Sequence, residues 1–315
     1  MDLSVRLGSL HLSNPLIAAS GCFGYGLEYA DVVDLASLGA VAVKGLFLTS
    51  REGHPPPRIV ETPAGMLNAI GLQGIGIRRF LGEKMPELRA RGAVVIVNIC
   101  GSTLEEYVEL ARILDGEPGV AALELNISCP NIKEGGITFG CNLGATSAVV
   151  GAVRRATRLP IIPKLTPNVA DISAFARAAE DAGADAVSLV NTFLAMAIDV
   201  ETRRPLLSNV MGGLSGPAIR PIAVRMVYEC ARKVKIPVIG IGGIATARDV
   251  LEFLIAGATA VQVGTASFVD PFIWPKLLDG LRDYMDRHRL ARLADVIGTL
   301  RPGRPDNDGP ADCCA

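Results

Sequence analysis

The sequence is short of the residues that usually build metal sites. It holds three histidines and seven cysteines, dispersed over 315 residues. No Cys-x-x-Cys pair occurs, and no cysteine lies near a histidine at the spacing of a zinc or iron–sulfur site, so no metal is expected in this chain. An odd number of scattered thiols fits a reducing cytoplasm, which is the expected location.

A charge excess and a long apolar run are also missing. Lysine and arginine number 31 against 32 aspartates and glutamates, which gives a formal net charge of −1. Without a basic stripe, nucleic acid and anionic membranes are not expected partners. Residues 1–6 contain no signal-peptide core, and no apolar run approaches the roughly 20 residues of a membrane span.

Half of the residues are nevertheless hydrophobic, and they recur in short runs separated by amphipathic stretches. Runs rich in Val, Ile, Leu and Ala are typical of parallel strands that are buried on both faces. Eight such strands are predicted, at residues 15–20, 41–47, 94–100, 122–128, 161–166, 186–192, 237–243 and 260–266. Helices are predicted between them, among them residues 103–114, 171–183, 219–234 and 246–257.

This alternation predicts an α/β fold of the (β/α)8 TIM-barrel type rather than an open doubly wound sheet. Val5–Leu12 is expected to form a short N-terminal hairpin that plugs the bottom of the barrel. The expected organisation is one domain over residues 1–300, followed by a polar, glycine- and proline-rich tail over 301–315 that we expect to be disordered.

Three long connections follow the C-terminal ends of predicted strands. They cover residues 48–93, 132–144 and 193–217, and they should meet at one face of the barrel. Long ordered excursions in a compact domain are usually lids or binding loops. Surface decoration is the alternative, and it is disfavoured because three separate connections converge on one rim.

Cys129 is the first candidate for catalysis. It lies where the fourth predicted strand ends, flanked by Asn126 and Asn131. In a barrel of alternating strands and helices the C-terminal mouth of the strands is where chemistry takes place. A free cysteine is more often a buried structural residue. The position of Cys129 alone therefore leaves both interpretations open.

Glycines and lysines suggest what the mouth of the barrel binds. Gly242–Gly243 and Gly264–Thr265 end the last two predicted strands, where glycines let backbone amides approach a phosphate. This pattern does not distinguish a phosphorylated substrate from a flavin mononucleotide. Lys44 and Lys164 lie inside apolar strands, and a buried lysine needs a partner such as an anionic ligand or an electron-rich ring. The alternative is a lysine that reaches to the rim.

Several motifs together resemble those of dihydroorotate dehydrogenases, over about residues 3–285. They are ASGCFG (19–24), NAIGL (68–72), NISCPN (126–131), KLTPN (164–168), GGLSGP (212–217) and the two terminal glycine motifs. A cysteine rather than a serine at position 129 resembles class 1. The segment 132–140 is similar to that of the NAD-linked class 1B catalytic subunit rather than the fumarate-linked form. The lack of an N-terminal membrane-binding extension argues against the quinone-linked class 2.

The resemblance implies oxidation of (S)-dihydroorotate to orotate in de novo pyrimidine (UMP) biosynthesis, with residues 1–300 as an FMN-binding barrel. Cys129 would be the base that takes a proton from C5 of the substrate while hydride leaves C6 for the flavin. FMN would be held by Ser20, Lys44, Gly45, Asn98, Asn126, Lys164, Val190, Gly216, Gly242, Gly243, Gly264 and Thr265. The pyrimidine would be held by Lys44, Asn68, Ala69, Ile70, Gly71, Leu72, Asn126, Asn131, Asn191 and Thr192.

The chemistry of these residues agrees with the ligands that the resemblance implies. Asparagines both donate and accept hydrogen bonds, as the amide edges of a pyrimidine require. Lys44 and Lys164 supply positive charge for a carboxylate and for a flavin that becomes anionic. The cofactor carries the redox step, while the protein supplies placement and proton transfer.

The resemblance also implies a partner, because this chain shows no NAD-binding fold and no iron–sulfur motif. An electron-transfer subunit with FAD and a 2Fe–2S cluster would pass electrons to NAD, and two copies of this chain would form a homodimer at the core of a heterotetramer. Two positions depart from the family pattern. Pro163 lies in a strand that should be central, where a missing N–H loosens the ladder, and Cys100 stands where a small residue is usual.

The sequence is also compatible with three other functions. A dihydropyrimidine dehydrogenase has a similar flavin barrel but substrates without the carboxylate. A phosphate-binding lyase or isomerase would use the terminal glycines without a flavin. A non-catalytic barrel is the least favoured, because polar residues at strand ends cost free energy when they have no ligand.

Overall fold

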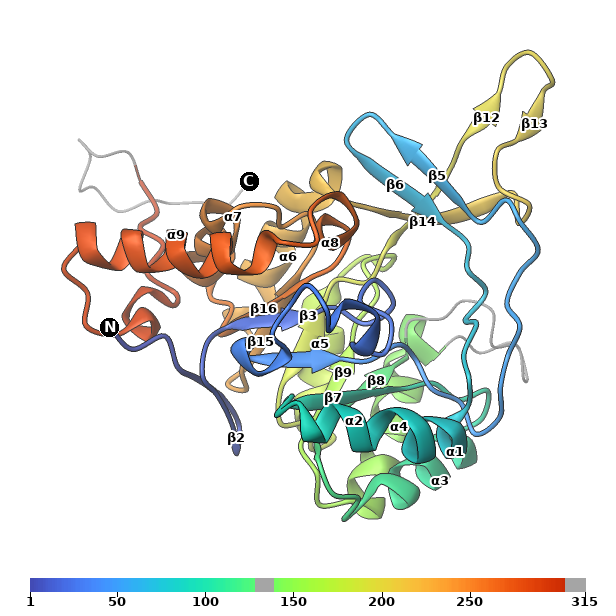
Figure 1. The fold of residues 1–315 in the computed structure, drawn as a ribbon, viewed down its shortest axis with the longest axis horizontal. Helices are drawn as coiled ribbons and strands as arrows, with labels where there is room; N and C mark the ends of the chain where they lie inside the picture. The colour runs from blue at the N-terminus through green and yellow to red at the C-terminus, as the bar shows by residue number, and fades with distance from the viewer. Residues whose placement is uncertain (128–138, 304–315) are drawn as a thin grey trace.

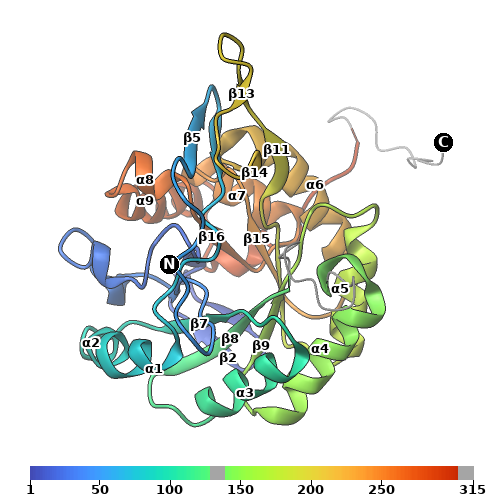
Figure 2. The same ribbon diagram turned by 90° about the vertical axis from the view of Figure 1, so that its right-hand side faces the viewer.

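The computed structural model describes residues 1–127 and 139–303. Within them, eight parallel strands close into a barrel in the order β10-β15-β16-β3-β4-β7-β8-β9 (Figures 1 and 2). The strands are β3 (Leu16–Ala18), β4 (Ala40–Ala42), β7 (Val95–Ile99), β8 (Val120–Asn126), β9 (Ile161–Lys164), β10 (Val187–Leu189), β15 (Val238–Ile241) and β16 (Ala260–Val263). The predicted (β/α)8 barrel is therefore confirmed.

Helices cover the outside of the barrel, as Figure 2 shows for α3, α4 and α5. The α-helices are α1 (Ile77–Arg79), α2 (Met85–Ala90), α3 (Leu104–Leu114), α4 (Leu143–Ala156), α5 (Ile172–Asp181), α6 (Arg220–Ala231), α7 (Ala247–Ala256), α8 (Ala266–Val269) and α9 (Ile273–Arg287). Shorter turns of helix are η1 (Leu27–Tyr29), η2 (Leu35–Ser37), η3 (Phe80–Lys84), η4 (Phe139–Cys141), η5 (Pro217–Ile219) and η6 (Leu293–Val296).

Side chains that precede the helices fix where they begin. Thr103 accepts a hydrogen bond from the Glu106 amide at the start of α3, and Asp171 caps α5 in the same way. Thr246 and Asp249 form a reciprocal capping box at the start of α7. Such caps satisfy amides that have no partner within the helix and typically stabilise it by about 1 kcal/mol each.

The connection between β3 and β4 differs from the expected strand–helix repeat. It contains only the short 3₁₀ turns η1 and η2 in place of an α-helix. Its first part is rich in glycine, and Gly21, Gly24 and Gly26 all have positive φ angles that an α-helix cannot accommodate. This connection therefore lacks the α-helix that a regular strand–helix repeat would place here.

An N-terminal hairpin closes the bottom of the barrel, as predicted. Strand β1 (Val5–Leu7) pairs antiparallel with β2 (Leu10–Leu12), and Leu7 and Leu12 are buried. Burying each leucine stabilises the fold by roughly 2 kcal/mol. The hairpin packs in one apolar cluster with inward-facing residues of the barrel: Ile17, Ala40, Ala42, Ile96, Ala122, Ile162, Ala186, Ile239 and Ala260.

Two of the long excursions join into a single structure at the opposite end. Strands β5 (Ile59–Thr62) and β6 (Gly65–Asn68) come from the first excursion, and β11 (Phe193–Met196) and β14 (Met211–Ser215) come from the third. They form one antiparallel sheet in the order β11-β14-β6-β5 (Figure 1). The excursions were predicted as lids or binding loops, and their pairing with each other was not predicted.

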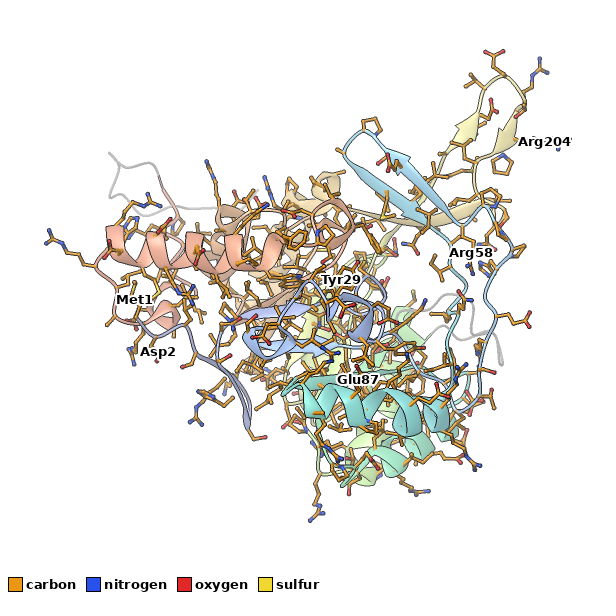
Figure 3. All side chains as sticks on the ribbon, viewed as in Figure 1. Met1, Asp2, Tyr29, Arg58, Glu87 and Arg204 are labelled. Atoms are coloured by element: carbon orange, nitrogen blue, oxygen red, sulfur yellow. The ribbon has the colours of Figure 1, made fainter. Side chains whose placement is uncertain are left out.

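A small arm extends from this sheet. It is the hairpin of β12 (Ile198–Asp199) and β13 (Arg204–Pro205), and Figure 3 shows Arg204 at this outlying position. Leu67 and Leu207 are buried in a separate small apolar cluster that joins the sheet to the base of the arm. The barrel mouth is thus bordered on one side by a structured sheet.

Apart from β8, the observed barrel strands are shorter than predicted, mainly at their C-terminal ends. Residues such as Lys44, Gly243 and Gly264 follow the last paired residue of their strands instead of lying within them. Pro163 has the expected effect. Strand β9 pairs with β8 at four positions but with β10 only at Lys164, because proline has no N–H to donate.

Among the helices of residues 1–127 and 139–303, none combines the length and apolar character needed to cross a membrane.

Candidate active site

The barrel interior changes from apolar to polar toward the C-terminal ends of its strands. Successive inward positions on a strand are two residues apart, so the residues two positions after the apolar bottom layer form the next layer. The polar residues of that layer are Asn98 on β7, Glu124 on β8, Lys164 on β9, Ser188 on β10 and Gln262 on β16, all of them buried. We call these five residues the polar layer. It lies below the barrel mouth.

Glu124 is at the centre of the polar layer and is fully buried. Its Oε1 accepts hydrogen bonds from Ser188 Oγ at 2.9 Å and Gln262 Nε2 at 2.5 Å. Its Oε2 accepts a hydrogen bond from Asn98 Nδ2 at 2.6 Å and lies 3.7 Å from Lys164 Nζ. Several strands therefore contribute side chains to one carboxylate, which satisfies the hydrogen-bonding needs of a buried charge.

Three of the residues predicted to hold FMN are in direct contact with one another. Ser20 Oγ accepts hydrogen bonds from Asn98 Nδ2 and from Lys164 Nζ, each at 3.3 Å. Gly45 lies beside Asn98, and a Cβ on this glycine would be 2.8 Å from Cys100 Sγ. The unusual Cys100 is buried, and its thiol donates to Asn98 Oδ1 at 3.6 Å. Cys100 thus helps to orient the Asn98 amide.

Electrostatics at the mouth favour an anionic ligand. Burial lowers the pKa of Lys44, and the nearby Arg58 guanidinium acts in the same direction. Burial raises the pKa of the Cys22 thiol to about 11, although the positive charges of Lys164 and Lys44 oppose this shift. Lys164 and Lys44 therefore both act on one thiol, which shows that positive charge is concentrated in this region.

The turns after β15 and β16, where the sequence predicts a phosphate site, come together. Gly242 and Gly243 follow β15 with φ angles of 132° and 71°. A Cβ on Gly243 would lie 2.7 Å from the carbonyl oxygen of Gly216. Beside them, Thr265 Oγ1 donates a hydrogen bond to Ser215 Oγ at 2.8 Å. Gly264 precedes Thr265, so these predicted residues lie in one region.

Residues predicted to hold the pyrimidine surround the ends of β8 and β10. Asn191 Nδ2 donates to Asn126 Oδ1 at 3.4 Å, which joins the two strands. Thr192 N donates to Asn191 Oδ1 at 2.8 Å. Val190, predicted for FMN, follows β10 and donates its amide to the carbonyl oxygen of Ile241 at 3.0 Å. Tyr107 OH donates to the Asn126 carbonyl at 2.7 Å, which anchors the end of β8 from the outside.

The sheet at the mouth brings the 68–72 segment to the same place. Asn68 Nδ2 donates to the Gly213 carbonyl oxygen at 3.3 Å, and a Cβ on Gly213 would clash with the Thr192 side chain. Asn68 and Thr192 are therefore neighbours across strand β14. The segment from Ala69 to Leu72 continues from Asn68, with His54 Nδ1 at 3.1 Å from the Ala69 carbonyl oxygen.

Cys129 and Asn131, and most of the connection 132–144, lie outside the described residues, as do residues 304–315 of the tail. Strand β8 ends at Asn126, three residues before the predicted base in the sequence. The assignment of Cys129 and Asn131 therefore stays a prediction from the sequence.

Sequence reasoning missed two residues at the centre of the site, Glu124 and Gln262. Both stand in apolar strand runs, Val-Ala-Ala-Leu-Glu-Leu and Ala-Val-Gln-Val. Like the two lysines, Glu124 is a charged residue inside an apolar strand, and a buried charge needs a partner. Its signal was therefore present in the sequence.

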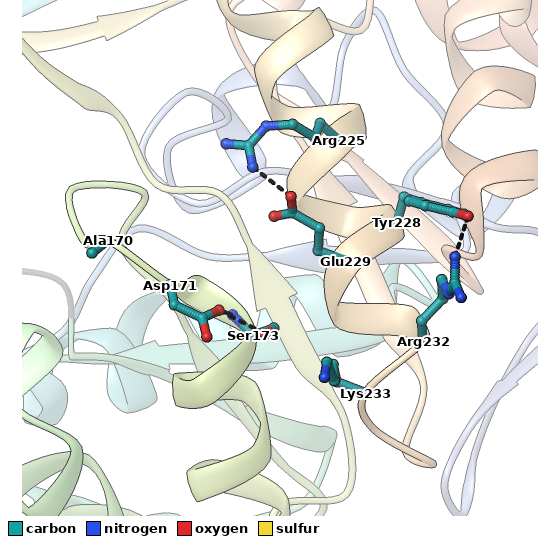
Figure 4. A pocket seen from close by; sticks show the side chains of 8 residues that line it. All are labelled: Ala170, Asp171, Ser173, Arg225, Tyr228, Glu229, Arg232 and Lys233. Carbon is teal, nitrogen blue, oxygen red and sulfur yellow. Dashed lines mark hydrogen bonds and ion pairs between the residues drawn. The ribbon is translucent and has the colours of Figure 1, made fainter. Parts of the chain in front are cut away.

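A second hollow lies outside the barrel. Figure 4 shows this cavity of about 490 Å³ between the start of α5 and one side of α6. Arg225 pairs with Glu229 at 2.6 Å, and Arg232 donates to Tyr228 OH at 2.5 Å, so these charges are satisfied within the protein. None of the described residues predicted for the site lines this cavity. In the described ranges, no group of three or more His, Cys, Asp or Glu side chains is placed to hold a metal ion.

Characterised proteins resemble this chain over nearly its whole length. The model of a protein family described as dihydroorotate dehydrogenase matches residues 2–285. Two relatives bear the name "Dihydroorotate dehydrogenase B (NAD(+)), catalytic subunit". The one from Pelobacter propionicus is 55% identical and that from Geotalea uraniireducens is 56% identical, each over 95% of this chain and 98% of its own length. A third with that name, from Bacteroides fragilis, is 51% identical over 95% of this chain and 99% of its own.

The fold has a match among solved structures. A crystal structure of dihydroorotate dehydrogenase from Eimeria tenella, in complex with ferulenol, superposes with a TM-score of 0.78 at 21% identity. The match covers 95% of this chain and 88% of the other, and at this identity it bears on the fold alone. On the family model and the relatives at more than half identity, the chain belongs to the dihydroorotate dehydrogenase family.

Proposed function

We propose that this chain is the catalytic subunit of an NAD-linked dihydroorotate dehydrogenase, which oxidises (S)-dihydroorotate to orotate in pyrimidine biosynthesis. One observation carries the proposal. Relatives with the name of that subunit are 55% identical over 95% of this chain and 98% of their own length. The unit that acts is one FMN-binding domain over residues 1–300, in the cytoplasm.

FMN fits the donor set of the site. Lys44 and Lys164 bring positive charge, and Ser20 and Asn98 bring a hydroxyl and an amide to the same end of the barrel. Glycine turns after β15 and β16 offer backbone amides of the kind that bind phosphate. Bound FMN would supply the two-electron acceptor. The proposed FMN ligands are Ser20, Lys44, Gly45, Asn98, Asn126, Lys164, Val190, Gly216, Gly242, Gly243, Gly264 and Thr265.

The protein's own residues bind and orient the substrate. Asn126 and Asn191 are already joined by a hydrogen bond, so their remaining amide groups are held in fixed directions. Lys44 supplies the positive charge that the substrate carboxylate needs. The proposed pyrimidine ligands are Lys44, Asn68, Ala69, Ile70, Gly71, Leu72, Asn126, Asn131, Asn191 and Thr192. Cys129 takes the proton from C5 of dihydroorotate.

Electrons leave through a partner subunit. The name "catalytic subunit" of the relatives implies a second subunit. We place FAD and a 2Fe–2S cluster on that subunit, and two copies of this chain at the core of a heterotetramer. NAD⁺ is then reduced on the partner and not on this chain.

The test is NAD⁺ reduction with and without the partner. The flavin-loaded chain, mixed with dihydroorotate and NAD⁺, should form little NADH alone, and an iron–sulfur flavoprotein subunit from the same organism should restore NADH formation. Efficient NADH formation by the isolated chain, or fumarate reduction at a comparable rate, would contradict the assignment to the NAD-linked class. Turnover of uracil in place of orotate would favour a dihydropyrimidine dehydrogenase.

A further inference from the structure

The polar layer contains a buried charge that the proposed reaction does not use. Glu124 is fully buried, and its position is two residues after Ala122 on the same inward face. The layer below is filled by apolar side chains, so the barrel can close without charge at this level. Replacing a buried ion pair by apolar residues is often neutral or stabilising. Fold stability alone therefore gives no reason for a carboxylate here.

The carboxylate fixes the direction of two amide side chains. Asn98 turns its NH₂ group toward Glu124, which leaves its Oδ1 to accept from Cys100 beside Gly45. Gln262 turns its NH₂ group toward Glu124 as well, which leaves its Oε1 to accept from Lys164 Nζ at 3.4 Å. Each amide has one direction that satisfies both of its neighbours, and Glu124 sets that direction.

The same carboxylate acts on the position of the lysine. Lys164 Nζ is 3.7 Å from Glu124 Oε2 and donates to Ser20 Oγ and to Gln262 Oε1. The ion pair and the Gln262 bridge together hold the ammonium group at the end of β9. A long lysine side chain loses considerable rotamer freedom when it is fixed. Because Glu124 and Gln262 already hold Lys164, that entropy is lost on folding and not on ligand binding.

We propose that Glu124 is a positioning residue for the flavin, acting through Lys164 and Asn98. It keeps the ammonium group and the amide in the orientations in which they bind the ring end of FMN, without touching the ligand itself. This inference rests on the proposed function, since it takes FMN as the ligand.

A glutamine cannot replace Glu124 without disturbing this arrangement. An NH₂ group in place of Oε2 would face the Asn98 NH₂ group and the Lys164 ammonium group. An NH₂ group in place of Oε1 would face the Gln262 NH₂ group, and reversing Gln262 would then turn a donor toward Lys164. In either orientation a donor faces a donor, although the shape of the side chain is unchanged.

The experiment measures FMN binding to the FMN-free full chain by quenching of flavin fluorescence. Glu124→Gln and Lys164→Met should each weaken binding by about tenfold or more, the scale of a lost hydrogen bond to a charged group. Because Glu124 acts partly through Lys164, the loss in the double variant should be clearly smaller than the product of the two single losses. Multiplicative losses would mean that Glu124 does not act through Lys164, and would overturn the proposal.

Asp185→Asn is the matched control. Asp185 is also a carboxylate in an ion pair, with Arg154 at 2.9 Å, and it accepts from the Ile161 amide at the opposite end of β9. This variant should lower the thermal stability of the FMN-free chain and leave FMN affinity within about twofold of wild type, because a distant site is energetically independent. Glu124→Gln with wild-type FMN affinity would overturn the proposal.

A milder variant decides the matter if Glu124→Gln does not fold. Ser188→Ala removes one hydrogen bond to Glu124 while keeping the charge, and Ser188 is not a proposed FMN ligand. It should weaken FMN binding several-fold, and unchanged binding would overturn the positioning role. A wild-type chain that binds no FMN would contradict the proposed function and this inference together, which separates that failure from a failure of the positioning role alone.

Discussion

The carbonyl oxygen of Gly216 lies 2.7 Å from the point where a Cβ would project from Gly243. The two glycines are therefore packed against each other by the protein itself. Gly243 also has a φ of 71°, a conformation that other residues rarely adopt. Loss of flavin on substitution of Gly243 would consequently report a disturbed turn as much as a blocked phosphate.

Gly264→Ala gives a cleaner test of the phosphate site. The atoms nearest to a Cβ at this position would belong to the Cys22 and Ala19 side chains, with Cys22 Sγ at 3.2 Å. The unfolding free energy of the FMN-free variant should therefore lie within about 1 kcal/mol of the wild-type value, as expected for a small change in packing. Its flavin content per chain should fall severalfold, because amide approach to a phosphate leaves no room for a Cβ.

Gly82→Ala is the control, since a Cβ there meets nothing within 4 Å. It should retain both stability and flavin. Full flavin content in Gly264→Ala would place the phosphate away from the turn after β16.

Lys44→Met should stabilise the FMN-free chain at pH 7 while it abolishes substrate binding. Burial lowers the pKa of Lys44 in the folded state below its ordinary value of 10.5. The unfolded chain therefore binds the Lys44 proton more tightly than the folded chain does. The charged lysine destabilises the fold at pH values below its lowered pKa, and this destabilisation disappears as the pH rises to 10.5. The expected gain in unfolding free energy at pH 7 is about 1 kcal/mol, the usual scale of a stabilising substitution.

Chemical denaturation at several pH values measures this gain. Lys235→Met, at an exposed lysine, should change the unfolding free energy little at any pH. A Lys44→Met chain that is less stable than wild type at pH 7 would show that the charge is not a cost in the folded state.

Cys22 should resist alkylation although it lies near two lysines. Burial raises the pKa of its thiol from 9.0 to about 11, so its thiolate fraction at pH 8 is lower by about a hundredfold. Iodoacetamide treatment of the FMN-free chain at pH 8, followed by peptide mass spectrometry, should label exposed Cys141 long before Cys22. Equal labelling rates in the folded chain would contradict the raised pKa of the Cys22 thiol.

Cys129→Ala should keep FMN and lose the reductive half-reaction. Removing a general base typically lowers the rate by a hundredfold or more, roughly 10²–10⁴. Cys129→Ser should be slow and require higher pH, because a hydroxyl is a weaker acid than a thiol and forms its anion less readily. Rapid mixing with dihydroorotate in the absence of oxygen measures both rates. A Cys129→Ala rate close to wild type would remove the cysteine from its role as base.

The barrel was predictable from the sequence because its signals are local. Apolar runs recur with turn residues between them, and helix caps such as Thr103 and Asp171 stand before the amphipathic stretches. The N-terminal hairpin was equally local. The four-stranded sheet was not predictable, because it depends on pairing between Asn68 and Gly213, which are 145 residues apart. No periodicity in either segment identifies a distant partner.

The site was predictable in part for the same reason. Lys44 and Lys164 stood out as charges inside apolar strands, and the glycines marked the ends of β15 and β16. Which residues contact one another depends on strand order and stagger in the closed barrel, so the convergence of Asn98, Lys164 and Gln262 on Glu124 could not be deduced from spacing.

The most direct test of the central claim is the visible spectrum of the flavin-loaded chain during anaerobic addition of dihydroorotate. The flavin absorbance should be lost as orotate forms, with about one orotate for each flavin reduced. Dihydrouracil, which lacks the carboxylate, should leave the spectrum largely unchanged because Lys44 then has no anionic group to bind. A chain that carries flavin but keeps its full absorbance with dihydroorotate, or that bleaches equally with dihydrouracil, would contradict the account.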